Sequence, residues 1–208
     1  MLGLSVNYRA RTIQDITASL QPNANQPETI PWYLYDTQQY VQAGQTSLSF
    51  FTTLPSPLDA SLTNMVLAGT LPNPWFFEMQ KMYFDVLNAA TTSTSQVGAA
   101  DDIQKIIMSG RGTWELTLSD KKYGPFPLRT LGGSGGVTAA LSTTDGAAPV
   151  TIQQANVRDN GGFPWNGALT IPPQTQMSVV LRWPAAQAIT ANTYVSIGML
   201  GLLSRRVS

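Results

Sequence analysis

Short segments in which apolar and polar side chains alternate recur along this chain of 208 residues, and they restrict it to a β fold. In Thr113–Leu118 (TWELTL) and Met177–Trp183 (MSVVLRW), every second residue is large and apolar. Since successive side chains of a strand point to opposite faces of a sheet, each segment predicts a strand with one buried face. Together with comparable segments that lie between turn residues, they predict eight or nine strands after residue 46. The others are 47–52, 64–71, 75–87, 127–131, 150–157, 167–171 and 193–203.

Residues 75–87 (WFFEMQKMYFDVL) fit two periods. With a period of two, Tyr83 shares a face with Phe77 and Met79, and Phe84 lies on the opposite face with Met82. With a period of 3.6, the apolar side chains form one helical stripe. The aromatic content and the flanking prolines favour a long strand that is buried on both faces.

The excursion from residue 88 to 111 predicts one short helix. Aspartates at 101 and 102 suit a helix N-terminus, isoleucines at 103, 106 and 107 form an apolar stripe, and Gly110 suits a C-terminal cap. Glycine also marks the last predicted strand, where Gly198 and Gly201 indicate a close backbone approach or a bulge.

Two further segments predict turns or connectors. Ser119–Pro125 is typical of a turn, as is Arg158–Gly162. The glycine-rich run 132–136 lacks the Lys-Ser/Thr pair of a phosphate-binding loop and no helical pattern follows it, so we interpret it as a flexible connector.

The composition excludes several kinds of chemistry. The chain has no histidine and no cysteine, which removes imidazole bases, thiolate nucleophiles and the usual zinc ligands. Its 12 basic and 12 acidic residues balance, whereas binding to phosphate backbones normally needs a basic excess. We therefore expect no cofactor, no bound metal and no direct sequence-specific contact with nucleic acid. Charged residues make up only 12% of the chain, about half the usual share, which favours a surface of neutral polar groups or one buried against neighbours.

Residues 1–45 differ from the rest of the chain. The polar run 21–27 contains two prolines and leads into the aromatic cluster PWYLY at 31–35. We interpret 1–45 as an extended N-terminal arm that lies on a neighbour, followed by one domain at 46–208. The alternative is an edge strand with a loop that packs on its own domain.

The strand number and the long crossing connections predict a single jelly-roll β-sandwich with one inserted helix, and a seven-stranded fibronectin-like sandwich is the structural alternative. Several short phrases resemble the jelly-roll coat proteins of tailless icosahedral bacteriophages over roughly residues 46–206. These phrases are LTNM at 62–65, GTLP at 69–72, LTIPPQ at 169–174, LRWP at 181–184, VSIGMLG at 195–201 and the arginines at 205 and 206.

The resemblance implies a subunit that assembles into capsomers around a double-stranded DNA genome, often over an internal lipid membrane. The chain is too short for two full jelly rolls, which leaves open a single-barrel major capsid protein, a penton or a minor component. We expect no enzymatic activity, a location in the virion after assembly in the host cytoplasm, and contacts with copies of itself and with other capsid proteins. The expected assembly contacts are Arg9, Arg11, Trp32, Tyr33, Tyr35, Arg205 and Arg206.

Two other functions remain as alternatives. Jelly rolls also serve as carbohydrate-binding or receptor-binding modules, in which case the aromatic residues at 32–40 would form a sugar platform. A glycoside hydrolase needs only two carboxylates, and the candidates are Glu78, Asp85, Glu115 and Asp120. For Glu115 the structural interpretation is a solvated residue on the polar face of its strand, beside a buried Trp114.

Overall fold

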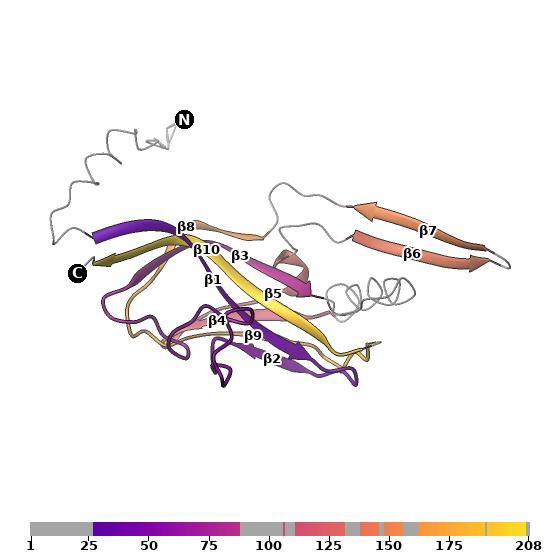
Figure 1. Ribbon diagram of the computed structural model, residues 1–208, viewed down its shortest axis with the longest axis horizontal. Helices are drawn as coiled ribbons and strands as arrows, with labels where there is room; N and C mark the ends of the chain where they lie inside the picture. The colour runs from indigo at the N-terminus through magenta and orange to yellow at the C-terminus, as the bar shows by residue number, and fades with distance from the viewer. Residues whose placement is uncertain are drawn as a thin grey trace, which may run out of the picture.

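The computed structural model describes residues 27–87, 106, 111–131, 138–145, 148–155, 162–189 and 191–206. Over these residues the fold is all-β, as predicted (Figure 1). The elements in chain order are β1 (Pro27–Tyr40), β2 (Ser47–Phe50), β3 (Phe76–Leu87), β4 (Thr113–Leu118), β5 (Lys121–Pro127), the 3₁₀ helix η2 (Leu128–Leu131), β6 (Thr138–Asp145), β7 (Ala148–Ala155), β8 (Phe163–Ile171), β9 (Met177–Arg182) and β10 (Thr193–Arg206).

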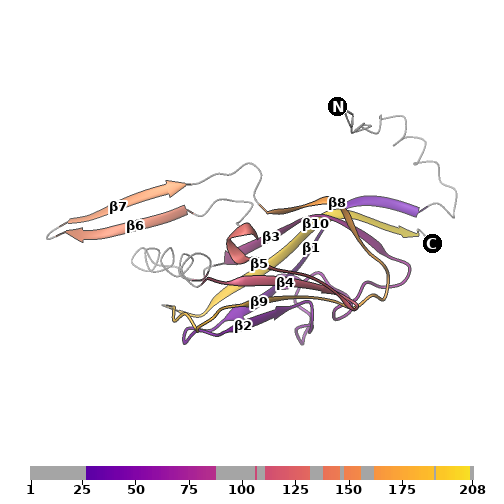
Figure 2. The same cartoon turned by 180° about the vertical axis from the view of Figure 1, so that it is seen from behind.

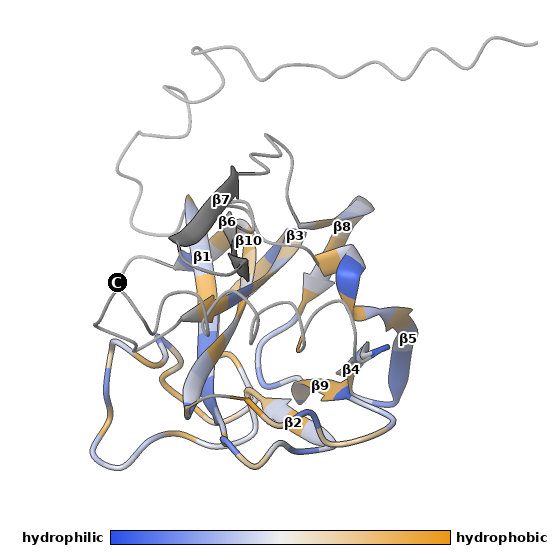
Figure 3. Cartoon of the chain, turned by 90° about the vertical axis from the view of Figure 1, so that its right-hand side faces the viewer, coloured by the Kyte–Doolittle hydropathy of each residue, from blue (hydrophilic) through white to orange (hydrophobic). Residues whose placement is uncertain are grey.

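Two four-stranded sheets form a sandwich. The first sheet has the order β1-β10-β3-β8 and the second has the order β2-β9-β4-β5. Figure 3 shows them as two layers, and Figure 2 shows the ribbon of Figure 1 from behind. Strands β6 and β7 pair with each other as a separate hairpin and belong to neither sheet.

The strand pairs of the sandwich are nested. β1 pairs with β10, β2 with β9, β3 with β8 and β4 with β5, and every pair is antiparallel. Strands β1, β3, β8 and β10 form one layer, and strands β2, β4, β5 and β9 form the other.

The core lies between the two sheets. Strand β4 alternates between half-buried and buried positions, and β9 does so from Met177 to Leu181. Trp114 and Leu116 of β4 meet Met177, Val179 and Leu181 of β9 on the inner face, and all five are fully buried. Trp183 continues this row with 3% of its surface exposed, so the alternation predicted for 113–118 and 177–183 is confirmed.

Strand β3 confirms the predicted strand at 75–87, but not the predicted faces. Met79 pairs with Gly201 and Lys81 with Leu200, so Gln80 is an extra residue without a partner in β10. This bulge reverses the alternation: Phe77 and Met79 face the core before it, and Met82 and Phe84 face the core after it. Tyr83 consequently lies on the face opposite Phe77 and Met79, which corrects the expected arrangement.

The glycine prediction for β10 is confirmed at this bulge. A Cβ atom on Gly201 would lie 2.0 Å from the backbone oxygen of Glu78, closer than any real contact. The backbones of β3 and β10 approach each other here because no side chain separates them.

The segment 64–71 is not a strand, contrary to its apolar pattern. Instead, the side chain of Asn64 forms hydrogen bonds with the backbone of the edge strand β1. Its Oδ1 accepts from the N–H of Tyr35 at 3.0 Å, and its Nδ2 donates to the carbonyl of Tyr33 at 2.6 Å. Thr63 Oγ1 donates to the carbonyl of Tyr35 at 3.0 Å. This loop therefore covers part of the β1 edge with side-chain hydrogen bonds rather than with a strand.

Two other local predictions need correction, and one strand was missed. The turn expected at 119–125 comprises only Ser119 and Asp120, and the following residues form β5. The extended piece expected at 127–131 is helix η2 after its first residue, with Leu128 and Leu131 buried. Strand β6 lacked a clear alternating pattern and was not predicted.

Several predictions fall on residues outside the described ones. These are the glycine-rich run 132–136, most of the turn at 158–162 and, apart from Ile106, the helix at 101–110. Ile106 itself is buried, and its carbonyl accepts a hydrogen bond from Trp183 Nε1 at 2.8 Å.

The interpretation of residues 1–45 as an arm does not hold for β1. Residues 27–40 pair with β10 along their whole length and form the edge of the first sheet, which was the alternative interpretation. Leu34 and Tyr40 of β1 point into the core and are buried. The rest of the proposed arm up to β1, residues 1–26, lies outside the described residues.

Candidate interaction surface

The side of the first sheet that faces away from the second sheet is the outer face, and aromatic side chains gather on it. The register of β1 and β10 places Tyr33 opposite Leu200, Tyr35 opposite Gly198 and Thr37 opposite Ser196. β10 pairs on its other side with β3, where Gly198 meets Tyr83 and Ser196 meets Asp85. The outer face therefore has tyrosines on both sides of β10 at the point where β10 carries the small residues Ser196 and Gly198.

Tyr33, Tyr35 and Tyr83 form the tyrosine cluster. The rings of Tyr33 and Tyr35 stack with centroids 5.9 Å apart and an interplanar angle of 24°. The rings of Tyr33 and Tyr83 are 6.4 Å apart and tilted by 49°. Tyr33 thus leans across β10 and connects the aromatic groups of β1 with those of β3.

Gly198 makes this arrangement possible. A Cβ atom at this position would lie 1.8 Å from the hydroxyl oxygen of Tyr33. Any larger residue in the centre of β10 would move the Tyr33 ring away from Tyr83. Gly162 has a similar role on the other side, since its Cβ would lie 2.6 Å from the ring of Tyr83.

Asp85 adds a negative charge beside the cluster. It lies one step along the outer face of β3 from Tyr83 and is partly exposed. Burial raises its pKa above the usual value of 3.8. Burial and then the charge of Asp85 raise the pKa of Tyr33 to about 12. No described residue forms an ion pair with Asp85.

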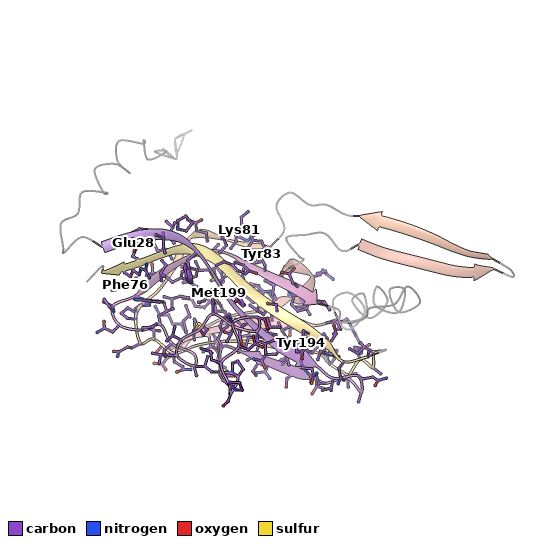
Figure 4. The ribbon with its side chains drawn as sticks, viewed as in Figure 1. Glu28, Phe76, Lys81, Tyr83, Tyr194 and Met199 are labelled. Carbon is purple, nitrogen blue, oxygen red and sulfur yellow. The ribbon has the colours of Figure 1, made fainter. Side chains whose placement is uncertain are left out.

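Exposed apolar side chains extend the surface toward both ends of the sheet. Tyr33, Phe76, Tyr194 and Leu200 each expose between 37% and 44% of their surface. They are four of the eight large apolar side chains that are exposed among the described residues, so this face holds half of them. Figure 4 shows Phe76 and Tyr194 at opposite ends of the sheet, with Lys81 and Tyr83 between them.

The structure brings together only part of the predicted assembly residues. Tyr33 and Tyr35 lie on the outer face, but Trp32 points inward and packs against the core. Arg205 Nε donates to Glu28 Oε2 at 3.0 Å across β1 and β10, near the end of the sheet. Arg206 pairs in register with Pro27. Arg9 and Arg11 lie outside the described residues.

The four carboxylate candidates for glycoside hydrolysis are divided between the two sheets. Glu78 and Asp85 belong to β3 of the first sheet, and seven residue-to-residue steps along the strand separate them by about 20 Å. Glu115 lies on the outer face of the second sheet, where Lys122 Nζ is 3.7 Å from its Oε1. Asp120 is exposed in the β4–β5 turn.

Other features of the described residues give few further candidates. Their best-formed cavity measures about 10 Å³, lies beside Trp32, Leu34 and Trp75, and has room for about one water molecule. Among these residues no group of three or more acidic, histidine or cysteine side chains is arranged to hold a metal. None of the helices in the described part of the chain is long and apolar enough to span a membrane.

Asp36 is a buried carboxylate with a structural role. It is 1% exposed, and its Oδ2 accepts from the N–H of Phe51 at 2.6 Å and from Gln38 Nε2 at 3.1 Å. Phe51 has a φ of 62°, so this hydrogen bond holds a strained backbone at the end of β2. Burial raises the pKa of Asp36, and its hydrogen bonds act in the opposite direction.

Sequence reasoning missed Tyr194 and Leu200 as surface residues, and it missed Tyr83, which faces outward but is only 8% exposed, as a member of the tyrosine cluster. It considered Asp85 only as a possible hydrolase carboxylate. For β10 a signal was available, because Val195, Ile197 and Met199 mark the inner face and their neighbours must face outward. For Tyr83 and Asp85 no local signal existed, because the bulge at Gln80 decides their face. No protein-family model, no curated protein and no solved structure matches this chain.

Proposed function

We propose that this protein is a self-assembling structural subunit of an icosahedral viral shell and that it has no catalytic role. The observation that carries the proposal is the aromatic outer face of the first sheet. A solvated sheet face is normally polar, whereas this one exposes Tyr33, Phe76, Tyr194 and Leu200. Exposed aromatic and apolar side chains in one region are typical of protein interaction surfaces.

The nested strand pairing supports a jelly-roll topology for the sandwich. A jelly roll has eight strands in two sheets, and a folded-over hairpin yields the pairs of first with last strand, second with second-last, and so on inward. The pairs β1–β10, β2–β9, β3–β8 and β4–β5 fit this order when the β6–β7 hairpin is counted as an insertion. The fold itself also suits lectins, so the surface rather than the topology selects the proposed function.

The proposal includes a location and partners. The subunit occupies the virion after assembly in the host cytoplasm, and its contacts are other copies of itself and other capsid proteins. The balanced charge and the 12% share of charged residues suit a subunit whose surface is buried by neighbours rather than one that coats nucleic acid. An internal lipid layer beneath the shell belongs to the same proposal.

Sedimentation of the purified full-length protein tests this function. We expect closed particles or discrete oligomers in analytical ultracentrifugation and in negative-stain micrographs. A single monomeric species at high concentration would contradict the proposal. The receptor-binding alternative is favoured by the stacked, partly exposed pair Tyr33 and Tyr35, and it predicts glycan binding by a monomer or a small oligomer.

A deletion of residues 1–26 separates assembly from folding. A deletion through residue 45 would also remove β1 and expose the edge of β10, so its effect on assembly would have no clear meaning. We expect the shorter deletion to keep the β-sheet circular dichroism spectrum of the full chain and to assemble poorly. Particle yield equal to that of the full chain would show that residues 1–26 have no part in assembly.

A further inference from the structure

The tyrosine cluster and Asp85 have the chemistry of a site for an organic cation. Aromatic rings attract cations to their faces, and guanidinium groups also stack on such rings. Three rings from two strands gather here around Tyr33, with centroid separations of 5.9 and 6.4 Å. A carboxylate beside them supplies the opposite charge that a planar guanidinium pairs with.

Asp85 indicates a ligand independently of the rings. It is partly withdrawn from water and no described residue forms an ion pair with it, although an ionised carboxylate in such a position normally has a partner. Lys81 lies on the same outer face of β3, but no salt bridge joins it to Asp85. A cation that approaches from outside the described residues would satisfy this charge.

The chain itself contains a suitable cation. Residues 1–26 include two basic residues, Arg9 and Arg11, and one acidic residue, Asp15. The two arginines give this segment a net positive charge opposite in sign to that of Asp85. The segment joins the sheet at Pro27, the first residue of β1, and 26 residues can span at most about 90 Å.

We propose that the tyrosine cluster and Asp85 bind a guanidinium of the Arg9–Arg11 segment from a neighbouring copy of this chain. This inference rests on the proposed function, because it names the surface through which copies of the subunit meet. Tyr33 and Tyr35 provide the accessible ring faces, and Tyr83, which is only 8% exposed, packs beside Tyr33. Asp85 provides the counter-charge, and Gly198 leaves the space in which Tyr33 reaches across β10.

Charge reversal on each side tests the contact in the full-length protein. We expect Asp85→Arg and the double variant Arg9→Glu with Arg11→Glu each to weaken self-association by roughly tenfold or more, measured by sedimentation equilibrium. Circular dichroism and thermal unfolding verify that each variant is folded. If Asp85→Arg does not fold, Asp85→Asn removes the charge with nearly the same shape, and we expect it to weaken self-association as well.

Mixing the two charge-reversal variants distinguishes a contact between copies from a contact within one copy. Each variant alone lacks one partner, but the mixture pairs the intact arginines of one with the intact Asp85 of the other. We expect mixed oligomers that neither variant forms alone. Absence of mixed oligomers from folded variants would overturn the proposal, since a contact within one chain is not rescued by mixing.

Asp120→Arg is the matched control, because it makes the same change of charge at an exposed turn of the second sheet. We expect its association to equal that of the natural chain. If the natural chain assembles and Asp85→Arg assembles equally well, this inference fails while the proposed function stands. Binding of phosphatidylcholine vesicles that Asp85→Asn abolishes, with assembly unchanged, would also overturn it and assign the site to a lipid headgroup. A monomeric natural chain would overturn the proposed function itself.

Discussion

The outer faces of the two sheets differ strongly, although their inner faces form one shared core. On the first sheet the outer positions include Tyr33, Tyr35 and Tyr83 around a glycine. On the second sheet they are mainly hydroxyl and charged residues: Ser47, Ser49, Thr113, Glu115, Thr117, Ser178, Val180 and Arg182. The second face is a typical solvated sheet surface, whereas the first has the composition of an interface. The comparison shows that the same alternating pattern builds both layers, which differ in the residues that point outward.

The largest expected effect is at the bulge that defines the outer face of the first sheet. Gly201→Ala places a Cβ atom against the backbone oxygen of Glu78, and a backbone atom cannot move aside as a flexible side chain does. We expect a loss of about 3 kcal/mol in the free energy of unfolding, measured by urea denaturation. Ser49→Ala, an exposed change on the second sheet, is the control and should stay within about 0.5 kcal/mol. Equal stability of the two variants would mean that the close approach at Gly201 does not constrain the sheet.

A substitution of Asp36 tests the contact between β1 of the first sheet and the chain at the end of β2 of the second sheet. Asp36→Ala removes the acceptor for the N–H of Phe51 and leaves that donor buried. We expect a loss of about 2 kcal/mol in the free energy of unfolding, by the same denaturation measurement. Asp120→Ala, which changes an exposed carboxylate in a turn, serves as the comparison and should have little effect. A loss no larger than that of Asp120→Ala would contradict the structural role of Asp36.

The half-buried carboxylate of Asp85 predicts that the stability of the protein depends on pH. Burial raises the folded-state pKa of Asp85 above its unfolded value, so the folded protein holds this proton more tightly. The resulting stabilisation is complete below the unfolded pKa and is lost as pH rises through the folded pKa. We expect Asp85→Asn to flatten the decline in stability over the acidic range above pH 3.8, measured by thermal unfolding as a function of pH. Asp36 contributes a decline of the same sign, so the variant should remove only part of it. An unchanged profile would show that Asp85 is solvated like a surface carboxylate.

The pKa of Tyr33 provides a second test of the same site, because it depends on the charge of Asp85. Its pKa of about 12 arises first from burial and then from the charge of Asp85. We expect Asp85→Asn to lower this pKa toward 10, the usual value for tyrosine, while the effect of burial remains. The measurement is the ring-carbon chemical shift of labelled tyrosine as a function of pH, with Tyr33→Phe to assign the signal. A pKa unaffected by Asp85→Asn would place the carboxylate too far from the hydroxyl to interact.

The smallest effects should come from the exposed ion pairs, and they should be similar on both sheets. Lys122 and Glu115 are 3.7 Å apart on the second sheet, and Arg205 and Glu28 are 3.0 Å apart on the first. Since exposed pairs are screened by water, we expect Lys122→Ala and Arg205→Ala each to cost less than about 1 kcal/mol. A much larger loss for Arg205→Ala in thermal unfolding would indicate that this pair closes the end of the first sheet.

Much of the fold could be predicted from the sequence because its strands carry a local signal. The strands at 47–50, 113–118 and 177–182 lie inside the predicted segments, and Trp114, Val179 and Trp183 face the core as expected. The alternation that buries these residues involves only near neighbours in the chain, so no knowledge of the partner strand is needed. At 64–71 the local pattern predicted a strand that does not form. There the side chain of Asn64 instead forms hydrogen bonds with the backbone of β1, which is distant in the sequence.

The sequence by itself determined that the chain forms a β-sandwich with an apolar interior, that it lacks imidazole and thiol chemistry, and that Tyr33 and Tyr35 are candidates for contact. Only the tertiary structure decided that residues 27–40 complete the first sheet, and that Tyr83 and Asp85 join those tyrosines on its outer face. The physical reason is the bulge at Gln80, which reverses the faces of β3 and depends on the close approach of β10 at Gly201. That approach involves residues more than a hundred positions apart, and a periodicity read within one strand contains no information about it.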